Sequence, residues 1–395
     1  YRMIKKILKA SITLRNEPFR FFFPLALLFA IAGVLKWPVM FWAENATYPG
    51  QSHAFLMTEG FFGGFIIGFA MTAIPRMMDS KRNHRGLLFL MALVFLIMNC
   101  ILSHGPVALG NILFIVLMLL FAGQLTLHFR NRKCLPPPGF ILMLPAIICA
   151  IGGASLSVFE WNEDTSPFLQ QLRPLILYQA WPLLPFLGVC PFFLPKFMGE
   201  PGKHDLPDCF KPSQEWKNRA VSSCILSAGV LGSMCLEALH LNRIGLAMRG
   251  AFIIGFFIQE LPKPFLRFGG DKIVKCICLC LWAIPSAYWL AAAMPAYRIA
   301  WVHWSLVGGL SALTLTVATR VILGHSGHIG MLKKKTAWFV IMIALIWVGM
   351  VSRVSGDIWP KIMQSHFIYA AICWLTAVTI WIVKVLPKLT VPAED

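Results

Sequence analysis

Charged residues are scarce in this chain: only 13% of its 395 residues are charged, and just 17 are Asp or Glu. Hydrophobic residues make up 58% of the sequence, and the mean hydropathy is +0.70. A water-soluble domain cannot keep so apolar a surface dispersed, so the composition excludes a soluble protein and indicates a polytopic membrane protein. Spanning helices of roughly 20 residues each would use most of the length, which leaves no room for a separate globular domain.

Several sequence signatures are also missing. The 11 cysteines include no C-x-x-C pair and lie mostly inside apolar stretches, which argues against a disulfide framework and against the usual zinc sites. No Walker loop, G-x-S-x-G or H-E-x-x-H occurs, and the loops are short, so an ordinary hydrolase is poorly supported. The basic, amphipathic stretch from Tyr1 to Asn16 is followed by no signal-peptide cleavage pattern.

What the chain does have is a succession of long apolar segments. They predict an all-α fold, a polytopic membrane helical bundle with about 12 transmembrane helices. The eighth segment is the shortest, and it carries Arg249. The predicted cores are Phe21–Trp42, Ala54–Ile74, Leu87–Ser103, Val107–Leu127, Phe140–Phe159, Leu175–Leu194, Ala220–Leu239, Ile244–Ile258, Ile273–Met294, Ile299–Leu323, Thr336–Val351 and Ile362–Leu386.

Basic residues outnumber acidic ones by 35 to 17, which gives a formal net charge of +18. In a soluble protein this balance would suggest nucleic-acid binding, but here most of the basic residues fall in alternate loops, on one predicted side of the membrane. Basic loops are retained in the cytoplasm during insertion, so the charge predicts cytoplasmic N and C termini, with the lipid bilayer and no nucleic acid as partner. The opposite side and its helix ends hold Arg173, Arg243, Arg249, Arg298, Arg353 and Lys361, and Lys36 lies inside the first span.

The whole chain, residues 1–395, is predicted to be a single transmembrane domain. Its longest connection, residues 195–219, lies in the middle of the sequence on the cytoplasmic side, so a six-plus-six division of the helices is the alternative. Residues 64–76 and residues 308–320 share a weak sequence similarity, which is little evidence for an internal duplication.

Histidine is the informative ionisable residue, because ionisable groups in a bilayer are costly and are functional candidates by default. Half of the ten His fall at the outer ends of predicted spans, each on a different helix. Neutral imidazoles that converge at one depth are the ligands that a haem iron or a copper ion needs. The alternative for any one of them is a residue solvated at the membrane interface. The five are His53, His104, His240, His303 and His366.

Two acidic residues lie near this outer layer. Glu237 and His240 project from one helix face, and Arg249 lies about two turns into the next span, within reach of Glu237. Such a pair would orient a ligand, bind a haem propionate or carry protons; alternatively it is a buried ion pair that holds two helices in register. Glu59 follows His53 by six residues, about 9 Å of helix rise.

Three stretches of the sequence resemble the NnrS family: PFRFFFPLALLFAIAG (residues 18–33), SHAFLMTEGFFGGFIIGFAMTAIPR (residues 52–76) and HWSLVGGLSALTLTVATRVILGHSGH (residues 303–328). The resemblance implies a twelve-span protein of the bacterial inner membrane that carries haem b and copper and is linked to denitrification and to protection against nitric oxide. Many members read W-H-A-H-E-M near the start of the second span. This chain keeps the first His as His53 and has Phe55 and Leu56 in place of the second His and the Glu.

Residue depth and the resemblance together define the predicted site. The resemblance indicates His53, His303, Arg320 and His325 as site residues. The choice of haem or copper ligands rests instead on the shared depth of the histidines in the membrane, near the outer ends of their predicted spans. On the cytoplasmic side, His325 is expected either to form a separate metal site with His328 or to cap the tenth helix, where positive charge is favoured. The predicted ligands are His53, His240, His303 and His366, and the further cofactor-binding residues are Glu237, Arg249 and Arg320.

Three functions compete at this point. The first is a haem-binding membrane protein of nitrogen-oxide metabolism, with or without copper, that binds nitric oxide or another small nitrogen oxide, or transfers electrons, near the outer face. Whether it is a redox enzyme stays open. The second is an accessory membrane subunit of a respiratory or nitrogen-oxidising complex. The third is a twelve-span secondary transporter, which ranks lower because the ionisable groups lie near the outer boundary rather than at the midplane.

Overall fold

The computed structural model describes residues 17–43, 47–80, 83–159, 166–207, 209–262, 265, 268–334 and 336–391. These residues form helices and connections, and no strand occurs among them. The predicted all-α fold is therefore confirmed. The basic stretch from Tyr1 to Asn16 lies outside the described residues, as do Lys81 and Arg82 of a predicted cytoplasmic loop.

Several spans consist of more than one helical element. In chain order the elements are α2 (Phe19–Trp42), α3 (Gly50–Phe55), η1 (Leu56–Phe62), α4 (Gly63–Met77), α5 (Arg85–His104), α6 (Val107–Arg130), η2 (Pro138–Leu142), α7 (Met143–Val158), α8 (Pro167–Leu175), η3 (Ile176–Ala180), α9 (Trp181–Phe193), α10 (Pro195–Met198), α11 (Gln214–Ala238), α12 (Asn242–Glu260), α14 (Lys272–Ala293), η4 (Pro295–Tyr297), α15 (Arg298–His303), η5 (Trp304–Ser311), α16 (Ala312–His325), α17 (Met331–Lys334), α18 (Ala337–Ile358), η6 (Pro360–Ile362), α19 (Met363–Val385) and η7 (Leu386–Thr390).

The predicted spans all correspond to helices. In the part of the chain that the structure describes, 11 helical segments are long and apolar enough to cross a membrane. The remaining predicted span corresponds to α12, which packs between α11 and α14 and carries Arg249. The chain is thus a multi-pass membrane protein.

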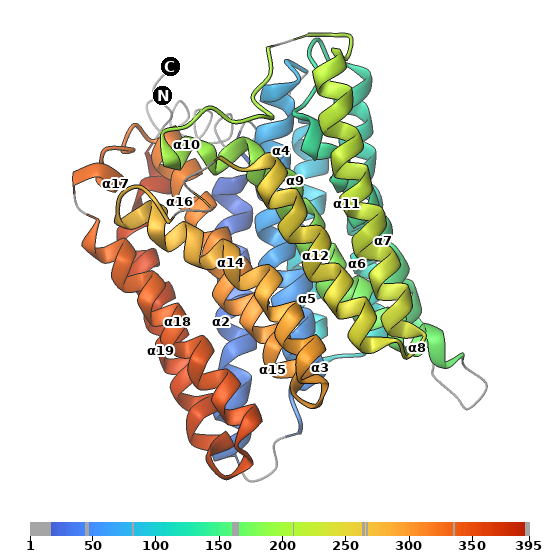
Figure 1. The fold of residues 1–395 in the computed structure, drawn as a ribbon, viewed down its shortest axis with the longest axis vertical. Helices are drawn as coiled ribbons and strands as arrows, with labels where there is room; N and C mark the ends of the chain where they lie inside the picture. Colours follow the sequence, from blue (N-terminus) through green and yellow to red (C-terminus); the bar gives the residue numbers. More distant parts are fainter. Residues whose placement is uncertain are drawn as a thin grey trace.

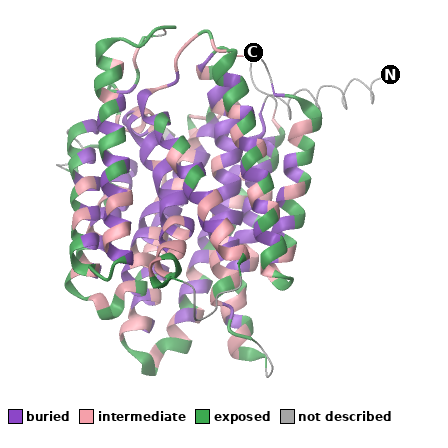
Figure 2. Cartoon of the chain, turned by 90° about the vertical axis from the view of Figure 1, so that its right-hand side faces the viewer, coloured by how far each residue is buried: buried purple, intermediate pink, exposed green. Residues whose placement is uncertain are grey.

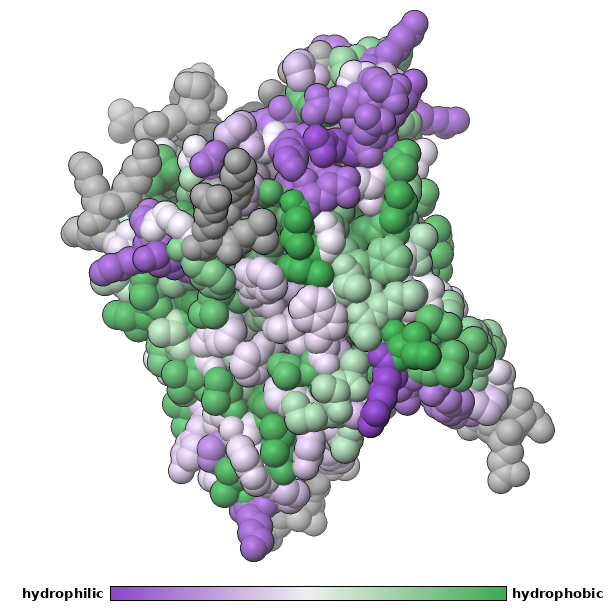
Figure 3. Space-filling model, in the orientation of Figure 1, coloured by the Kyte–Doolittle hydropathy of each residue, from purple (hydrophilic) through white to green (hydrophobic). Residues whose placement is uncertain are grey.

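The spans pack side by side into one bundle, with α18 and α19 along one side and α7 and α11 along the other (Figure 1). Helices from the two halves of the sequence contact each other directly, α2 against α19 and α4 against α16. Buried residues fill the interior, and exposed residues lie on the outward faces and at the ends (Figure 2). On the face shown in Figure 3, apolar and weakly polar side chains lie between the more hydrophilic ends. This belt is the surface that the lipid tails cover.

The first and last described segments meet at one end of the bundle. The side chain of Arg20, at the start of α2, donates a hydrogen bond to the backbone carbonyl of Leu389 in η7. A first span that starts and a last span that ends on the same side require an even number of crossings, in agreement with twelve spans. The charge distribution predicts that this end is cytoplasmic.

Three spans are interrupted by π-helical segments, η1, η3 and η5. Such wide turns are rare and concentrate at functional sites. Residues that weaken the regular helical pattern accompany them: Gly60 lies in η1, Pro174 and Pro182 flank η3, and Gly308 and Gly309 lie in η5. The three segments contribute to the wall of one cavity.

Candidate functional site

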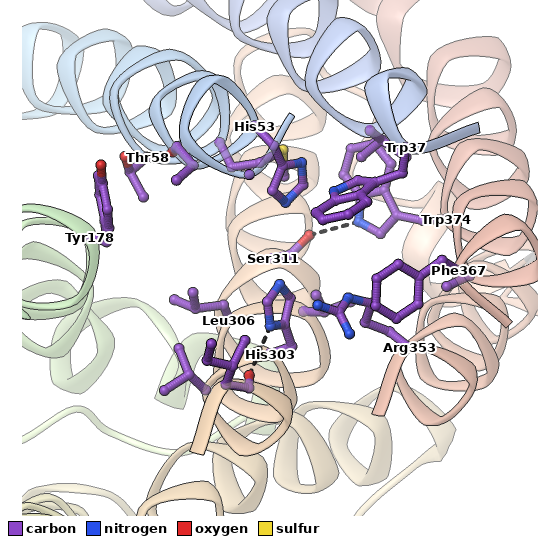
Figure 4. Close-up of a pocket in the computed structure, with 18 of the residues that line it drawn as sticks. Trp37, His53, Thr58, Tyr178, His303, Leu306, Ser311, Arg353, Phe367 and Trp374 are labelled. Carbon is purple, nitrogen blue, oxygen red and sulfur yellow. Dashed lines mark hydrogen bonds between the residues drawn. The ribbon is translucent and has the colours of Figure 1, made fainter. Parts of the chain in front are cut away.

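The cavity has a volume of about 500 Å³ and lies between the three interrupted spans, α2, α18 and α19. Each π-helical segment contributes side chains to it, such as Thr58 from η1, Tyr178 from η3 and Leu306 from η5 (Figure 4). Aromatic side chains from the outer half of the bundle complete the wall; they include Trp37 and Trp374. A largely apolar pocket with a few convergent polar groups is typical of a small-molecule or cofactor site.

His53 and His303 face each other across this cavity (Figure 4). Their ring centroids are 6.5 Å apart and their ring planes differ by 18°. Nδ1 of His53 lies 3.0 Å from the carbonyl oxygen of Gly33, and Nδ1 of His303 lies 2.8 Å from that of Ile299. A carbonyl oxygen only accepts, so each Nδ1 carries the proton and donates it. The Nε2 lone pair of each imidazole is left for a ligand.

The charged side chains that line the described wall of the cavity have one sign. Arg173, Arg298 and Arg353 line it, and no Asp or Glu is among the described residues that do. Arg353 is held by Asp357, one helical turn along α18, at 2.6 Å, and its guanidinium lies 3.8 Å from the ring centroid of Phe367. This wall favours a ligand that carries negative charge.

The two histidines suit a haem better than a bare metal ion. A porphyrin supplies four ligands to its iron, so one or two imidazoles from the protein complete the coordination. His53 and His303, whose ring centroids are 6.5 Å apart and whose Nδ1 atoms are both hydrogen-bonded to backbone, would hold such an iron through Nε2. An ion without a porphyrin commonly takes three or four protein ligands, and within the described ranges no cluster of three or more His, Cys, Asp or Glu could hold one.

The predicted contact between Glu237 and Arg249 is present. A guanidinium nitrogen of Arg249 lies 2.7 Å from a carboxylate oxygen of Glu237, and both side chains are buried. Gly245 brings α12 close to α11, because a Cβ at this position would lie 2.5 Å from the carbonyl oxygen of Ser233. The other two guanidinium nitrogens donate to Ser233 Oγ at 3.0 Å and to Gln179 Oε1 at 3.1 Å.

This ion pair supports one wall of the cavity. Gln179 lines the cavity and accepts from Arg249, while Arg298 lines the cavity and donates to Glu237. The pair therefore joins α11 and α12 and also fixes two side chains that a bound molecule would meet. Both roles considered for it from the sequence, helix registration and support of a ligand site, are compatible with this position.

The other outer histidines do not line the cavity. His240 follows the end of α11 with a backbone φ of 66°, and its exposed ring approaches the side-chain nitrogen of Gln171 at 3.2 Å. The ring nitrogen Nδ1 of His366 lies 3.2 Å from Ser352 Oγ, and the neighbouring Phe367 is the residue that reaches the cavity. His104 is exposed at the end of α5. The structure thus brings together two members of the predicted set of four ligands.

Arg320 and His325 lie near the opposite, cytoplasmic end. The guanidinium of Arg320 lies 4.9 Å from the ring centroid of Phe197. His325 bonds through Nδ1 to the carboxylate of Glu17, which also holds Arg20 and Arg76. This cluster ties the start of α2 to the ends of α4 and α16.

The Glu17 cluster makes the stability of the protein depend on pH. Burial of Glu17 favours its neutral form, but the hydrogen bonds and charges of His325 and Arg20 outweigh it and lower the pKa of Glu17 to about 2, from 4.5. A depressed pKa contributes stability above pH 4.5 that is lost as the pH falls through 2, here about 3 kcal/mol. We expect the temperature of the thermal unfolding midpoint in detergent to decrease as the pH is lowered from 4.5 to 2. The decrease should be smaller in Glu17→Gln. An equally steep fall in Glu17→Gln would contradict the assignment.

Arg353 and Trp37 are site residues that sequence reasoning missed. The sequence places Arg353 among the basic residues of the outer side, although an arginine within an apolar span is itself a signal of a functional position. Trp37 lies 5.8 Å from the ring of His53, centroid to centroid, but nothing in its sequence context separates it from the other interfacial aromatic residues.

The model of the NnrS protein family covers residues 13–392, nearly the whole chain. A search of curated proteins finds no match to this sequence.

Proposed function

This chain belongs to the NnrS family, and from that premise we propose that it is a haem-binding membrane protein of the nitric oxide response. Family membership supports the link to nitric oxide. The proposal for haem rests on the two histidines of the cavity. The membrane is proposed to be the bacterial cytoplasmic membrane, with the cavity near the outer face.

The observation that carries the proposal is the opposed pair of imidazoles. His53 and His303 come from spans that are distant in the sequence, yet each has its Nδ1 fixed by a backbone carbonyl and its Nε2 free. A hydrogen bond at Nδ1 fixes the tautomer and ring orientation of metal-ligating histidines in general, and raises their basicity. His53 and His303 would hold the iron, and haem would supply binding of nitric oxide or one-electron transfer.

The rest of the wall supports the same cofactor. Apolar and aromatic side chains suit the faces of a porphyrin, and Arg173, Arg298 and Arg353 would pair with its propionates. Copper has less support from this cavity than haem, because the described residues contain no group of three or more His, Cys, Asp or Glu that could hold a bare ion.

The visible spectrum of the full chain, purified in detergent without added metal, tests this proposal. We expect a Soret band, iron in the metal analysis, and a shift of the band when nitric oxide is added. A colourless, metal-free preparation would contradict haem binding, and a Soret band that nitric oxide leaves unchanged would restrict the protein to electron transfer.

A further inference from the structure

A second, smaller cavity lies next to the cavity of His53 and His303, which is called the histidine cavity below. The second cavity has a volume of about 60 Å³, and α2, η1, α4, α7, α9 and α16 contribute side chains to its wall. Among the described residues that line it, Thr314 is the one with a polar side chain, and none is charged. The others are apolar or aromatic, such as Phe65 and Ala318. This wall differs from that of the histidine cavity, which carries arginines.

Phe62 separates the two cavities. It lines both of them, and its side chain is buried. On two other spans the lining changes from one cavity to the other within one helical turn. Tyr178 lines the histidine cavity and Pro182 the second cavity, and Ser311 and Thr314 are related in the same way. Residues three or four positions apart share a helix face, so the second cavity continues the histidine cavity toward the cytoplasmic end.

The size and the chemistry of the second cavity limit what it can hold. A space of about 10–15 Å³ is enough for one water-sized molecule, so about 60 Å³ accommodates a diatomic molecule. A buried water needs about two to four polar partners, and Thr314 alone offers a polar side chain in the described wall. Apolar cavities in proteins stay dry and take up small apolar guests such as xenon. The second cavity therefore suits a small uncharged gas molecule.

We propose that the second cavity is a docking site for an uncharged diatomic gas, nitric oxide, which passes between it and the histidine cavity at Phe62. The ring of Phe62 belongs to both walls, so a rotation of this one side chain joins the two spaces. The gas binds without any covalent or redox step. The choice of nitric oxide rests on the proposed function, whereas the capacity to hold a small apolar molecule rests on the cavity alone.

Crystals of the full chain under xenon pressure test the cavity without reference to haem. We expect anomalous density for xenon beside Phe65 and Ala318 in the wild type. In Ala318→Leu this density falls by at least about tenfold, because the larger side chain fills the space. Ala251→Leu makes the same chemical change at an exposed position of α12, and this matched control should keep the density.

Nitric oxide binding to the coloured protein after flash photolysis tests the role of the cavity. We expect the second-order rate in Ala318→Leu to be at least about threefold lower than in the wild type, because the docking site that supplies the ligand is filled. The position of the Soret band should not change. Should Ala318→Leu fail to fold, Val317→Leu replaces it, because Val317 lines the same cavity and the change adds a single methylene.

Three results would overturn the proposal: no xenon in the wild-type cavity, equal xenon density in the wild type and Ala318→Leu, or equal rates of nitric oxide binding in these two proteins. A colourless protein whose cavity binds xenon would refute the haem function and leave the gas-binding cavity in place. A coloured protein that binds nitric oxide but no xenon would refute the docking site alone.

Discussion

His303→Ala removes most of the haem from the purified protein, and His240→Ala leaves it in place. The expectation follows from geometry, because His303 presents a free Nε2 to the cavity opposite His53, whereas His240 is exposed beyond the end of α11. His53→Ala should have the same effect as His303→Ala. The measurement is the ratio of Soret to protein absorbance after native purification.

His240→Ala is the matched control, since it removes an imidazole at the same predicted depth. Equal loss of haem in His240→Ala and His303→Ala would place the cofactor outside the cavity described here. Retention of the full Soret band in both His53→Ala and His303→Ala would show that these two residues are not its ligands.

Arg249→Met destabilises the protein by about 3–5 kcal/mol, the largest effect on folding that we expect from a single polar side chain. The substitution keeps most of the side-chain volume but removes the buried partner of Glu237. It also removes the hydrogen bonds that Arg249 donates to Gln179 and Ser233. Reversible unfolding of the detergent-purified protein, followed by intrinsic tryptophan fluorescence, measures the change in free energy.

Two variants show whether the cost comes from the unpaired charge. Combining Arg249→Met with Glu237→Gln should recover a large part of the lost stability, because no buried charge is then left without its partner. Arg298→Met removes the more exposed partner of Glu237 and should cost about 1 kcal/mol or less. An Arg298→Met variant as unstable as Arg249→Met would show that burial does not set the strength of these contacts.

The span pattern could be predicted because it depends on local sequence. Each apolar run must satisfy its own backbone hydrogen bonds in lipid, so run length alone indicates a helix, even for α12 with Arg249 inside it. The contact between Glu237 and Arg249 could also be predicted from the sequence, because the two residues lie on consecutive helices joined by a short turn.

The site was predicted only in part. Sequence position gives the depth of a histidine along its helix, but not the direction in which its side chain points. His53, His240, His303 and His366 therefore looked equivalent, and packing separates them: two line the cavity, one follows a helix end with a positive φ, and one bonds to Ser352. The π-helical segments had no recognised sequence signal beyond nearby glycine and proline.

By itself, the sequence determined the membrane class, the order of the helices, the end of the bundle that carries the basic loops, and the family. These properties follow from hydropathy, charge and local sequence motifs, which act segment by segment. Only the tertiary structure decided which imidazoles meet, that the charged side chains lining the cavity among the described residues are arginines, and that Glu59 is buried without a hydrogen-bond partner. Those outcomes depend on how each helix is rotated and which helices are neighbours, and both are set by packing among residues far apart in the chain.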